Sequence, residues 1–334
     1  MNESDTFNTM STATAPSTAP STAPSMAPSM APSSGAFPGA GLLGIYLRLT
    51  CVPVIWGATF IAGRIVSAHL PPATAAFIRF VFATLALLLA LHLLQGLRTL
   101  THITRRQLLG TMALGATGIL AYNLLFFSAL ALLPAGRTSL IVALNPVVTL
   151  LLAAVFLGER LSATRWVGVG LALLGVWIVV TRGDLSQLMQ SVGKGELLMF
   201  CAVCAWAVYT LLGRKLLQGL SPLLATLWAA LWGTLFLALL ALRDLPALHA
   251  ASFTAEVWAG LVFLGVLGTA VAFVWYYEGI RQLGAARTVV FNNLVPTFGV
   301  LLGWLVLGEP VSASLIIGGG MALAGVFLVN RIKR

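Results

Sequence analysis

Charged residues are scarce in this chain. They make up only 8% of its 334 residues, whereas hydrophobic residues make up 59%. Soluble domains carry about 25% charged residues, so this chain lacks the polar surface that a soluble protein needs. Several apolar runs reach the roughly 20 residues that cross a bilayer as a helix. The composition therefore predicts an all-α integral membrane protein with many spans.

Metal-binding and catalytic residue types are equally scarce. The chain has 3 cysteines and 4 histidines, the histidines are scattered, and neither HExxH nor GxxxxGK[ST] occurs. Cys201 and Cys204 form a CxxC motif inside an apolar run, but a structural zinc site uses four ligands. The missing phosphate-binding loop also excludes ATP hydrolysis by a P-loop. We expect no enzyme, no metal and no cofactor.

Residues 1–41 differ from the rest of the chain. They repeat Ser, Thr, Ala or Met with Pro and carry almost no charge. Such a segment cannot bury enough surface to offset its ordering entropy, so we expect a disordered tail. A dispensable extension is the expected role, and tethering of a partner is the alternative.

Ten helices are expected from the apolar runs. They lie near residues 45–67, 73–95, 106–130, 135–157, 164–181, 195–214, 222–242, 256–280, 285–307 and 312–330. With a cytoplasmic N-terminus, 13 Lys and Arg fall on the cytoplasmic side and 6 on the other, as the positive-inside bias predicts. This bias explains the net charge of +10 without nucleic acid. Both termini, including the basic residues 331–334, are expected in the cytoplasm.

The second half of the chain repeats the first at a constant offset. Glu159 and Glu309 are 150 residues apart (309 − 159 = 150), and the register holds without a gap from about residue 51 to 180. Matched pairs include Cys51 with Cys201, Trp56 with Trp206, Arg64 with Arg214, Pro72 with Pro222, Pro146 with Pro296, and Ser162 with Ser312. Five helices per copy place the copies in opposite orientations. Inverted repeats of this kind are typical of secondary transporters.

The combined pattern resembles the EamA family of the drug/metabolite transporter superfamily over about residues 49–330. It includes Trp56-Gly57, Pro72 followed by Arg79, a proline within the fourth and ninth helices, and Leu-Gly-Glu closing both. The resemblance implies a first repeat at 45–181, a second at 195–330, and export of amino acids, metabolites or toxic organic compounds. It also implies a location in the inner (plasma) membrane of a bacterial cell. The second half departs from the pattern at Ala207 and Ala229.

Two prolines are candidate hinges. Pro146 and Pro296 lie at the centres of the fourth and ninth helices, where each removes a backbone N–H. Helices broken at matching positions favour a substrate pathway, although ordinary packed kinks are the alternative. Nearby amides are costly if they face lipid, so we expect substrate contacts or interhelical bonds from Asn123, Asn145, Asn292 and Asn293.

Arg79 and a set of aromatic residues are further candidates for substrate binding. A charge two turns into the second helix favours a wet cavity or an anionic partner, and snorkelling to the interface is the alternative. Aromatic side chains suit apolar, aromatic or cationic solutes, or they anchor the helices at the interface. The candidate lining comprises Trp56, Tyr122, Trp206, Tyr209, Trp275, Tyr276 and Tyr277.

The remaining acidic residues and glycines are expected mainly to stabilise the fold. Glu278 is a candidate proton carrier, with pairing to Arg281 or Arg287 as the alternative. Glu159 and Glu309 are expected to stabilise helix N-termini. Glycines in the fifth and tenth helices predict close packing within the monomer or across a homodimer. A metabolite antiporter or importer of the same fold and a non-transporting scaffold are the alternatives to an exporter.

Overall fold

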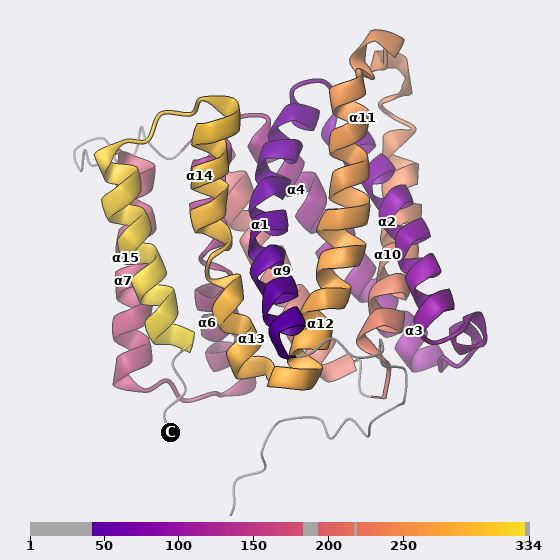
Figure 1. The fold of residues 1–334 in the computed structure, drawn as a ribbon, viewed down its shortest axis with the longest axis horizontal. Helices are drawn as coiled ribbons and strands as arrows, with labels where there is room; N and C mark the ends of the chain where they lie inside the picture. The colour runs from indigo at the N-terminus through magenta and orange to yellow at the C-terminus, as the bar shows by residue number, and fades with distance from the viewer. Residues whose placement is uncertain (1–41, 183–192, 217–218, 331–334) are drawn as a thin grey trace, which may run out of the picture. The chain divides into compact units, whose positions relative to one another are not determined.

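The computed structural model describes residues 42–182, 193–216 and 219–330, which form a bundle of helices (Figure 1). Ten helical segments within them are long and apolar enough to cross a membrane. Their boundaries differ from the expected ones by at most three residues. The 1–41 tail and residues 331–334 lie outside the described residues. The helical, ten-span architecture predicted from the sequence is confirmed.

Six of the spans are single helices and four are divided. The single helices are α1 (Leu42–Ser67), α2 (Pro72–Leu94), α7 (Ala163–Thr181), α9 (Lys194–Leu216), α10 (Pro222–Ala241) and α15 (Ala313–Asn330). The third span joins α3 (Arg105–Leu114), η2 (Gly115–Ala121) and α4 (Tyr122–Leu130), and the fourth joins α5 (Ala135–Val142) and α6 (Asn145–Leu157). The eighth joins α11 (Ala255–Val262), η6 (Phe263–Val271) and α12 (Ala272–Leu283), and the ninth joins α13 (Ala285–Asn292) and α14 (Val295–Leu307).

Local sequence explains where many of these helices begin and end. Ser162, Ser221 and Thr254 precede α7, α10 and α11, and each accepts a hydrogen bond from a backbone N–H of the first turn. Such caps satisfy donors that have no partner inside the helix. Gly158 and Gly308 end α6 and α14 at φ angles of 67° and 65°, a left-handed conformation that glycine adopts without strain.

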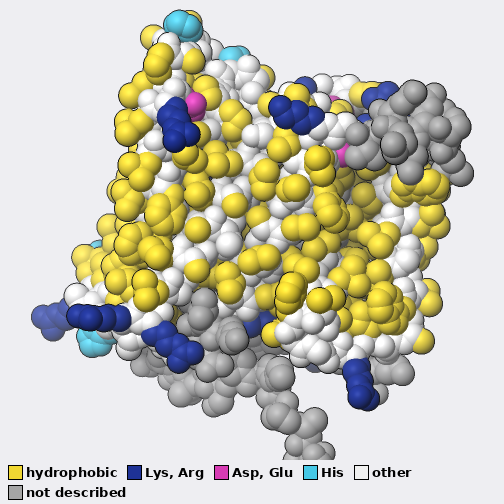
Figure 2. Space-filling model, turned by 180° about the vertical axis from the view of Figure 1, so that it is seen from behind, with side chains coloured by type: hydrophobic (Ala, Val, Ile, Leu, Met, Phe, Trp, Pro, Cys, Tyr) yellow, Lys and Arg dark blue, Asp and Glu magenta, His cyan; other side chains and the backbone are white. Residues whose placement is uncertain are grey.

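The outer surface of the bundle is apolar in its middle and charged towards its ends. Figure 2 shows hydrophobic side chains over most of one face, with Lys and Arg gathered near the two ends. Large apolar side chains such as Leu89, Val155 and Ile316 are exposed. Exposed apolar surface of this extent suits a lipid environment, so the chain is a multi-pass membrane protein.

The two ends of the bundle carry unequal positive charge. The end at which α1 begins, at the bottom of Figure 1, is called the arginine-rich face. Its described members are Arg48, Arg98, Arg105, Arg106, Arg160, Arg165, Arg214, Arg281 and Arg287. The other end is called the opposite face.

The two five-helix halves meet in matching contacts. Thr84 and its equivalent Thr234 share a hydrogen bond of 3.1 Å between α2 and α10. A β-carbon added at Gly175 in α7 would lie 2.4 Å from the Ala322 nitrogen in α15, and one at Gly325 would lie 2.4 Å from the Ala172 nitrogen. These helices lie side by side (Figure 1). The glycines therefore allow the helices to pack closely within one chain. Packing within the monomer was one of the two alternatives expected from the sequence, beside packing across a homodimer.

Both halves contain the same two kinds of interruption. The π-helical segments η2 and η6 occupy equivalent parts of the third and eighth spans. The fourth and ninth spans are each broken for two residues, and Pro146 and Pro296 then lie in the first turns of α6 and α14. The prolines therefore begin new helices. Movement at these breaks remains a prediction.

Candidate functional site

Arg79 points into the bundle. It is 9% exposed, so the alternative in which it snorkels to the interface is wrong. One terminal nitrogen donates to Asn123 Oδ1 at 3.0 Å and the other lies 3.5 Å from Thr269 Oγ1. Its Nε is buried and has no hydrogen-bond partner. The guanidinium therefore joins α2 to α4 and to η6 in the other half, with capacity for a further acceptor.

The charge of Arg79 has no acidic counterpart in the described part of the chain. The three ion pairs found there involve Arg48, Arg137 and Arg214 instead. The partners of Arg79 are neutral oxygens, together with the faces of Phe80 and Phe126 at 5.4 and 5.9 Å from its guanidinium carbon. Burying an unpaired charge is unfavourable. An anion beside Arg79 would compensate it.

One aromatic cluster adjoins Arg79 and Asn123. We call it the α4–α9 cluster; its members are Tyr122, Phe126, Trp206 and Tyr209. Tyr122 contacts Trp206 with ring centroids 5.0 Å apart and stacks on Phe126 at 5.8 Å, and Trp206 contacts Tyr209 at 5.1 Å. Tyr209 also packs where a β-carbon at Gly118 would lie, 2.3 Å from its ring. The predicted residues Tyr122, Asn123, Trp206 and Tyr209 thus come together beside Arg79.

A second aromatic cluster comes from α1 and the eighth span. We call it the α1–α12 cluster; its members are Trp56, Phe273, Tyr276 and Tyr277. Trp56 lies 5.6 Å from Phe273 and 5.3 Å from Tyr276 between ring centroids. Trp56 Nε1 also donates to the Gly268 carbonyl at 3.0 Å. Because Gly268 precedes the Thr269 that contacts Arg79, η6 links this cluster to the guanidinium.

Other predicted residues lie apart from these clusters or differ in their partners. Asn145 Oδ1 is buried without a partner, Asn292 is exposed, and Asn293 accepts from Asn330 at 3.1 Å. No ring contact joins Trp275 to either cluster among the residues described. Of these, Asn145 retains an open acceptor, whereas Asn293 joins α15 to the ninth span.

The partners expected for Glu278 are wrong. Glu278 pairs with Arg48 at 2.7 Å and accepts from Gln282 at 3.1 Å. Neither Arg281 nor Arg287 is its partner, because α12 packs against α1 and brings Arg48 to the carboxylate. Glu159 is likewise not on a helix N-terminus: it pairs with Arg214 at 3.3 Å. Glu309 does cap a helix, but that helix is α5, more than 170 residues earlier.

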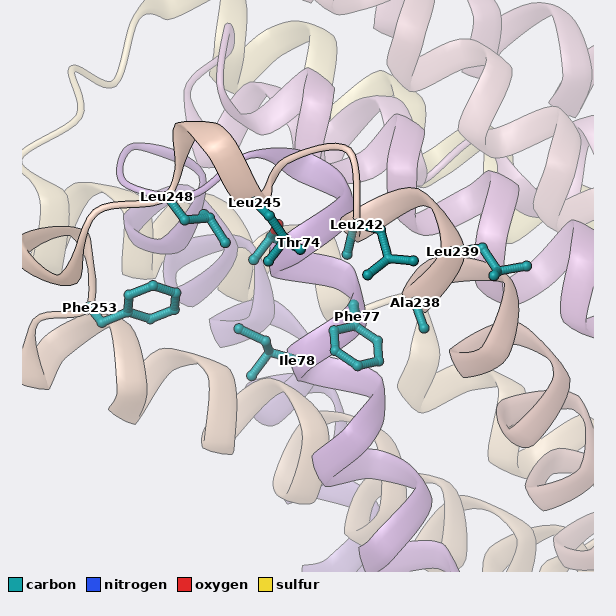
Figure 3. Close-up of a pocket in the computed structure, with 10 residues that line it drawn as sticks. Thr74, Phe77, Ile78, Ala238, Leu239, Leu242, Leu245, Leu248 and Phe253 are labelled. Carbon is teal, nitrogen blue, oxygen red and sulfur yellow. The ribbon is translucent and has the colours of Figure 1, made fainter.

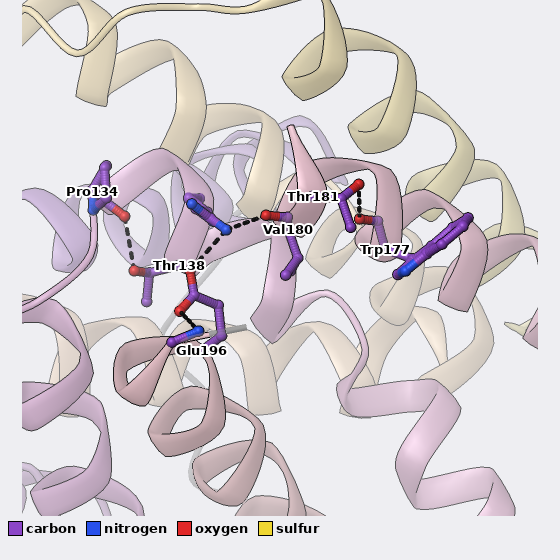
Figure 4. A network of polar contacts seen from close by, with 8 residues as sticks. Pro134, Thr138, Trp177, Val180, Thr181 and Glu196 are labelled. Carbon is purple, nitrogen blue, oxygen red and sulfur yellow. Dashed lines mark hydrogen bonds and ion pairs between the residues drawn. The ribbon is translucent and has the colours of Figure 1, made fainter. Parts of the chain in front are cut away.

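The opposite face is tightly joined around α5. Arg137 forms an ion pair of 2.8 Å with Glu196 and also donates to the Val180 carbonyl, so α5 is held to α9 and α7 (Figure 4). Ser139 is buried and lies 3.3 Å from the Pro296 carbonyl of α14. Helix α5 therefore packs closely against α14 at this face.

The arginine-rich face lacks the equivalent packing contact within the described residues. By the 150-residue offset, α13 and α6 correspond to α5 and α14, yet α13 and α6 barely touch within the described residues. Arg287, the equivalent of Arg137, is exposed, as are Val290 and Asn292 of α13. The broken ninth span is thus packed less closely at the arginine-rich face than the broken fourth span is at the opposite face.

A separate apolar groove lies at the opposite face, between α2 and the segment after α10. Its volume is about 270 Å³, and its lining includes Phe77, Ile78, Leu242 and Phe253 (Figure 3). Ligand sites usually hold a few placed polar groups that orient the ligand. Thr74 supplies the only hydroxyl in this lining, and it donates to Asp244 at 2.9 Å. This groove is therefore a weaker candidate for a ligand site than the surroundings of Arg79.

Some residues around Arg79 were not predicted from the sequence. Thr269, Phe126 and Phe273 are common types in apolar helices and carry no local signal. The repeat contained one indirect clue: Gly118 and Gly268 match at the 150-residue offset, and each packs against a residue at another matched position, Tyr209 and Thr59. The matched glycines therefore lie in the two π-helical segments and were a sequence signal for them.

Comparisons with known proteins agree with this architecture. The chain is 27% identical over 293 residues to the uncharacterized transporter YyaM of Bacillus subtilis (strain 168), and the match covers 87% of this chain and 95% of that protein. A probable terminal-alkyne amino-acid exporter of Streptantibioticus cattleyicolor is 33% identical over 219 residues, covering 65% of this chain and 71% of the relative. A probable amino-acid metabolite efflux pump of Salmonella typhimurium is 23% identical over 288 residues, with 83% and 91% covered.

A solved crystal structure shares the fold. Its TM-score is 0.58 at 21% sequence identity, and the match covers 86% of this chain and 96% of the other. The family model for EamA-like transporters matches residues 43–181 and again residues 193–331. These two matches include nearly all of the described residues. The chain belongs to the EamA-like transporter family.

Proposed function

We propose that the protein exports small molecules that carry a carboxylate, amino acids or related metabolites, by alternating access. The observation that carries this proposal is Arg79, a buried cation with neutral partners and an unused donor. A guanidinium binds carboxylates in a planar, two-pronged geometry. The α4–α9 cluster beside it suits an apolar or aromatic side chain, or an ammonium group.

We propose export as the direction of transport, on the basis of the proposed topology and of the relatives. We propose that the arginine-rich face lies in the cytoplasm, as the bias of Lys and Arg predicts, and that the looser packing of α13 against α6 represents a pathway open towards that face. A substrate would therefore enter from the cytoplasm. The names of the two relatives described above, an amino-acid exporter and an amino-acid metabolite efflux pump, support this direction and substrate class.

A substrate with a net negative charge would gain a driving force from the membrane potential, whereas a zwitterionic amino acid, which has no net charge, would not. A membrane potential that is negative inside favours the exit of an anion by about 2.3 kcal/mol per charge per 100 mV. Glu278, the candidate proton carrier, is held instead in a close ion pair with Arg48. We propose that Glu278 positions α12 against α1 and carries no proton.

Replacing Glu278 with glutamine tests this role. We expect transport to fall by no more than about fivefold and to keep the pH dependence of the wild type, because an ion pair that is partly exposed at Arg48 contributes only about 1 kcal/mol. Transport by the variant and the wild type should be measured between pH 5.5 and 8. Loss of pH dependence in the variant alone would instead identify Glu278 as the proton carrier.

The proposed substrate class can be tested by thermal unfolding of the purified protein. A ligand at 100 times its dissociation constant stabilises a single-site protein by about 2.7 kcal/mol. We expect stabilisation by one or more amino acids or carboxylates, and none by the matching amide or ester. Stabilisation by organic cations that lack a carboxylate would overturn the proposed class, since Arg79 would repel them.

A further inference from the structure

Two charged side chains hold the connection between α4 and α5 at the opposite face. Glu309 accepts from the backbone nitrogens of Ala135 and Gly136 at 2.6 and 2.9 Å. Arg64 donates to the carbonyl of Leu130, the last residue of α4. A carboxylate at a helix N-terminus and a guanidinium at a C-terminus both interact favourably with the helix dipoles. Both ends of this short connection are therefore clamped.

The equivalent side chains at the arginine-rich face make a different contact. Arg214 and Glu159 match Arg64 and Glu309 at the 150-residue offset, yet they pair with each other at 3.3 Å, with Arg214 exposed and Glu159 partly exposed. The clamp is therefore made at the face where α5 packs against α14, and an ion pair between its two equivalent residues is found at the face where α13 and α6 barely touch.

We propose that these four residues form a pair of alternating latches. In the state open to the opposite face, Arg64 and Glu309 leave the α4–α5 connection and pair with each other. Glu159 then accepts from the backbone nitrogens of Ala285 and Ala286, while Arg214 donates to the Ile280 carbonyl. Each transition thus exchanges one clamp for another of the same chemistry. This inference rests on the alternating access proposed above.

The two latches differ in how well each carboxylate fits when it is docked. This difference sets which of the two states is more populated. A β-carbon added at Gly303 would lie 2.7 Å from Glu309 Oε2, so only glycine leaves room for the docked carboxylate. The equivalent residue in the first half is Ala153, whose methyl group would crowd a docked Glu159. The latch at the arginine-rich face is therefore the weaker one, in agreement with its open state here.

Distances between spin labels on the full chain measure the two latches separately. In a background without the three native cysteines, one label pair at Leu132 and Val311 reports the opposite face. The equivalent pair at Gln282 and Leu161 reports the arginine-rich face. We expect Glu309→Gln to lengthen the first distance and shorten the second, raising the opposite-open population about tenfold. A hydrogen bond to a charged group contributes about 1.5 kcal/mol, close to a factor of ten.

Two further variants make the test specific. Ala153→Gly should shift both distances in the same directions as Glu309→Gln, because it makes room for Glu159 on α13. Glu256→Gln removes an exposed carboxylate outside either latch and should leave both distances unchanged. Unchanged distances in both Glu309→Gln and Ala153→Gly would overturn the proposal, as would equal shifts in the Glu256 control.

The same measurement separates this inference from the proposed function. Shifted distances in a protein that transports no carboxylate would support the latches and refute the substrate class. Unshifted distances in a protein that does transport one would refute the latches alone.

Discussion

Replacing Arg79 with glutamine should abolish substrate binding without destabilising the protein. Truncating one partner of a buried, hydrogen-bonded charge pair costs about 2–5 kcal/mol, which weakens binding by about 30-fold or more. The folded protein loses no ion pair, however, because the partners of Arg79 are the neutral Asn123 and Thr269. Removing an uncompensated buried charge should leave the melting temperature unchanged or raise it.

Thermal unfolding with and without ligand checks both parts of this prediction. Arg98→Gln is the matched control, since Arg98 is exposed in η1 (Leu97–Thr101), and it should keep the ligand shift. Arg79→Lys should retain weak binding, because lysine keeps the charge but loses the planar pair of donors. A large fall in the melting temperature of ligand-free Arg79→Gln would show that Arg79 is a structural clamp between the halves.

Replacing Gly175 with valine should separate α7 from α15 and strongly destabilise the protein. A β-carbon at this position would meet the Gly318 carbonyl at 2.5 Å as well as the Ala322 nitrogen, and backbone atoms cannot rotate away. Overpacking of this kind costs about 3 kcal/mol. In a membrane, where lipid is as apolar as leucine, such close packing holds helices together. We expect a clearly lower melting temperature in detergent.

Gly170→Val is the matched control for this change. Gly170 lies on the same helix but is exposed, and a β-carbon there would meet no atom within 4 Å. Its replacement should change the melting temperature little. Equal destabilisation by both variants would trace the effect to the helix propensity of valine and not to the crossing of α7 and α15.

The ten spans and the correspondence between the two halves could be predicted, because several sequence features indicate each of them. Long apolar runs set the boundaries, and one constant offset from about residue 51 to 180 matched the five helices of the first half to those of the second. The same offset placed Pro146 and Pro296 at matching breaks. Arg79 and Trp56 were predicted as candidates because a cation or an indole within an apolar span is unfavourable without a polar partner.

Side-chain partners could not be predicted, because they depend on how helices distant in the sequence pack. Glu278 pairs with Arg48, 230 residues away, although Arg281 is only one turn along the same helix. Thr269 contacts Arg79 only because η6 crosses α2. The different packing at the two faces could not be predicted either, because nearly equal repeats do not indicate which half packs more closely. Sequence equivalence of Glu159 and Glu309 therefore concealed their different contacts.

Counterflow in proteoliposomes tests the central claim most directly. Vesicles containing purified protein would be loaded with an excess of an unlabelled carboxylate from the binding panel, and entry of the labelled compound would be followed without an ion gradient. The account predicts transient accumulation by the wild type, none by Arg79→Gln, and none of the amide analogue. Accumulation of the amide analogue, or full activity of Arg79→Gln, would contradict it.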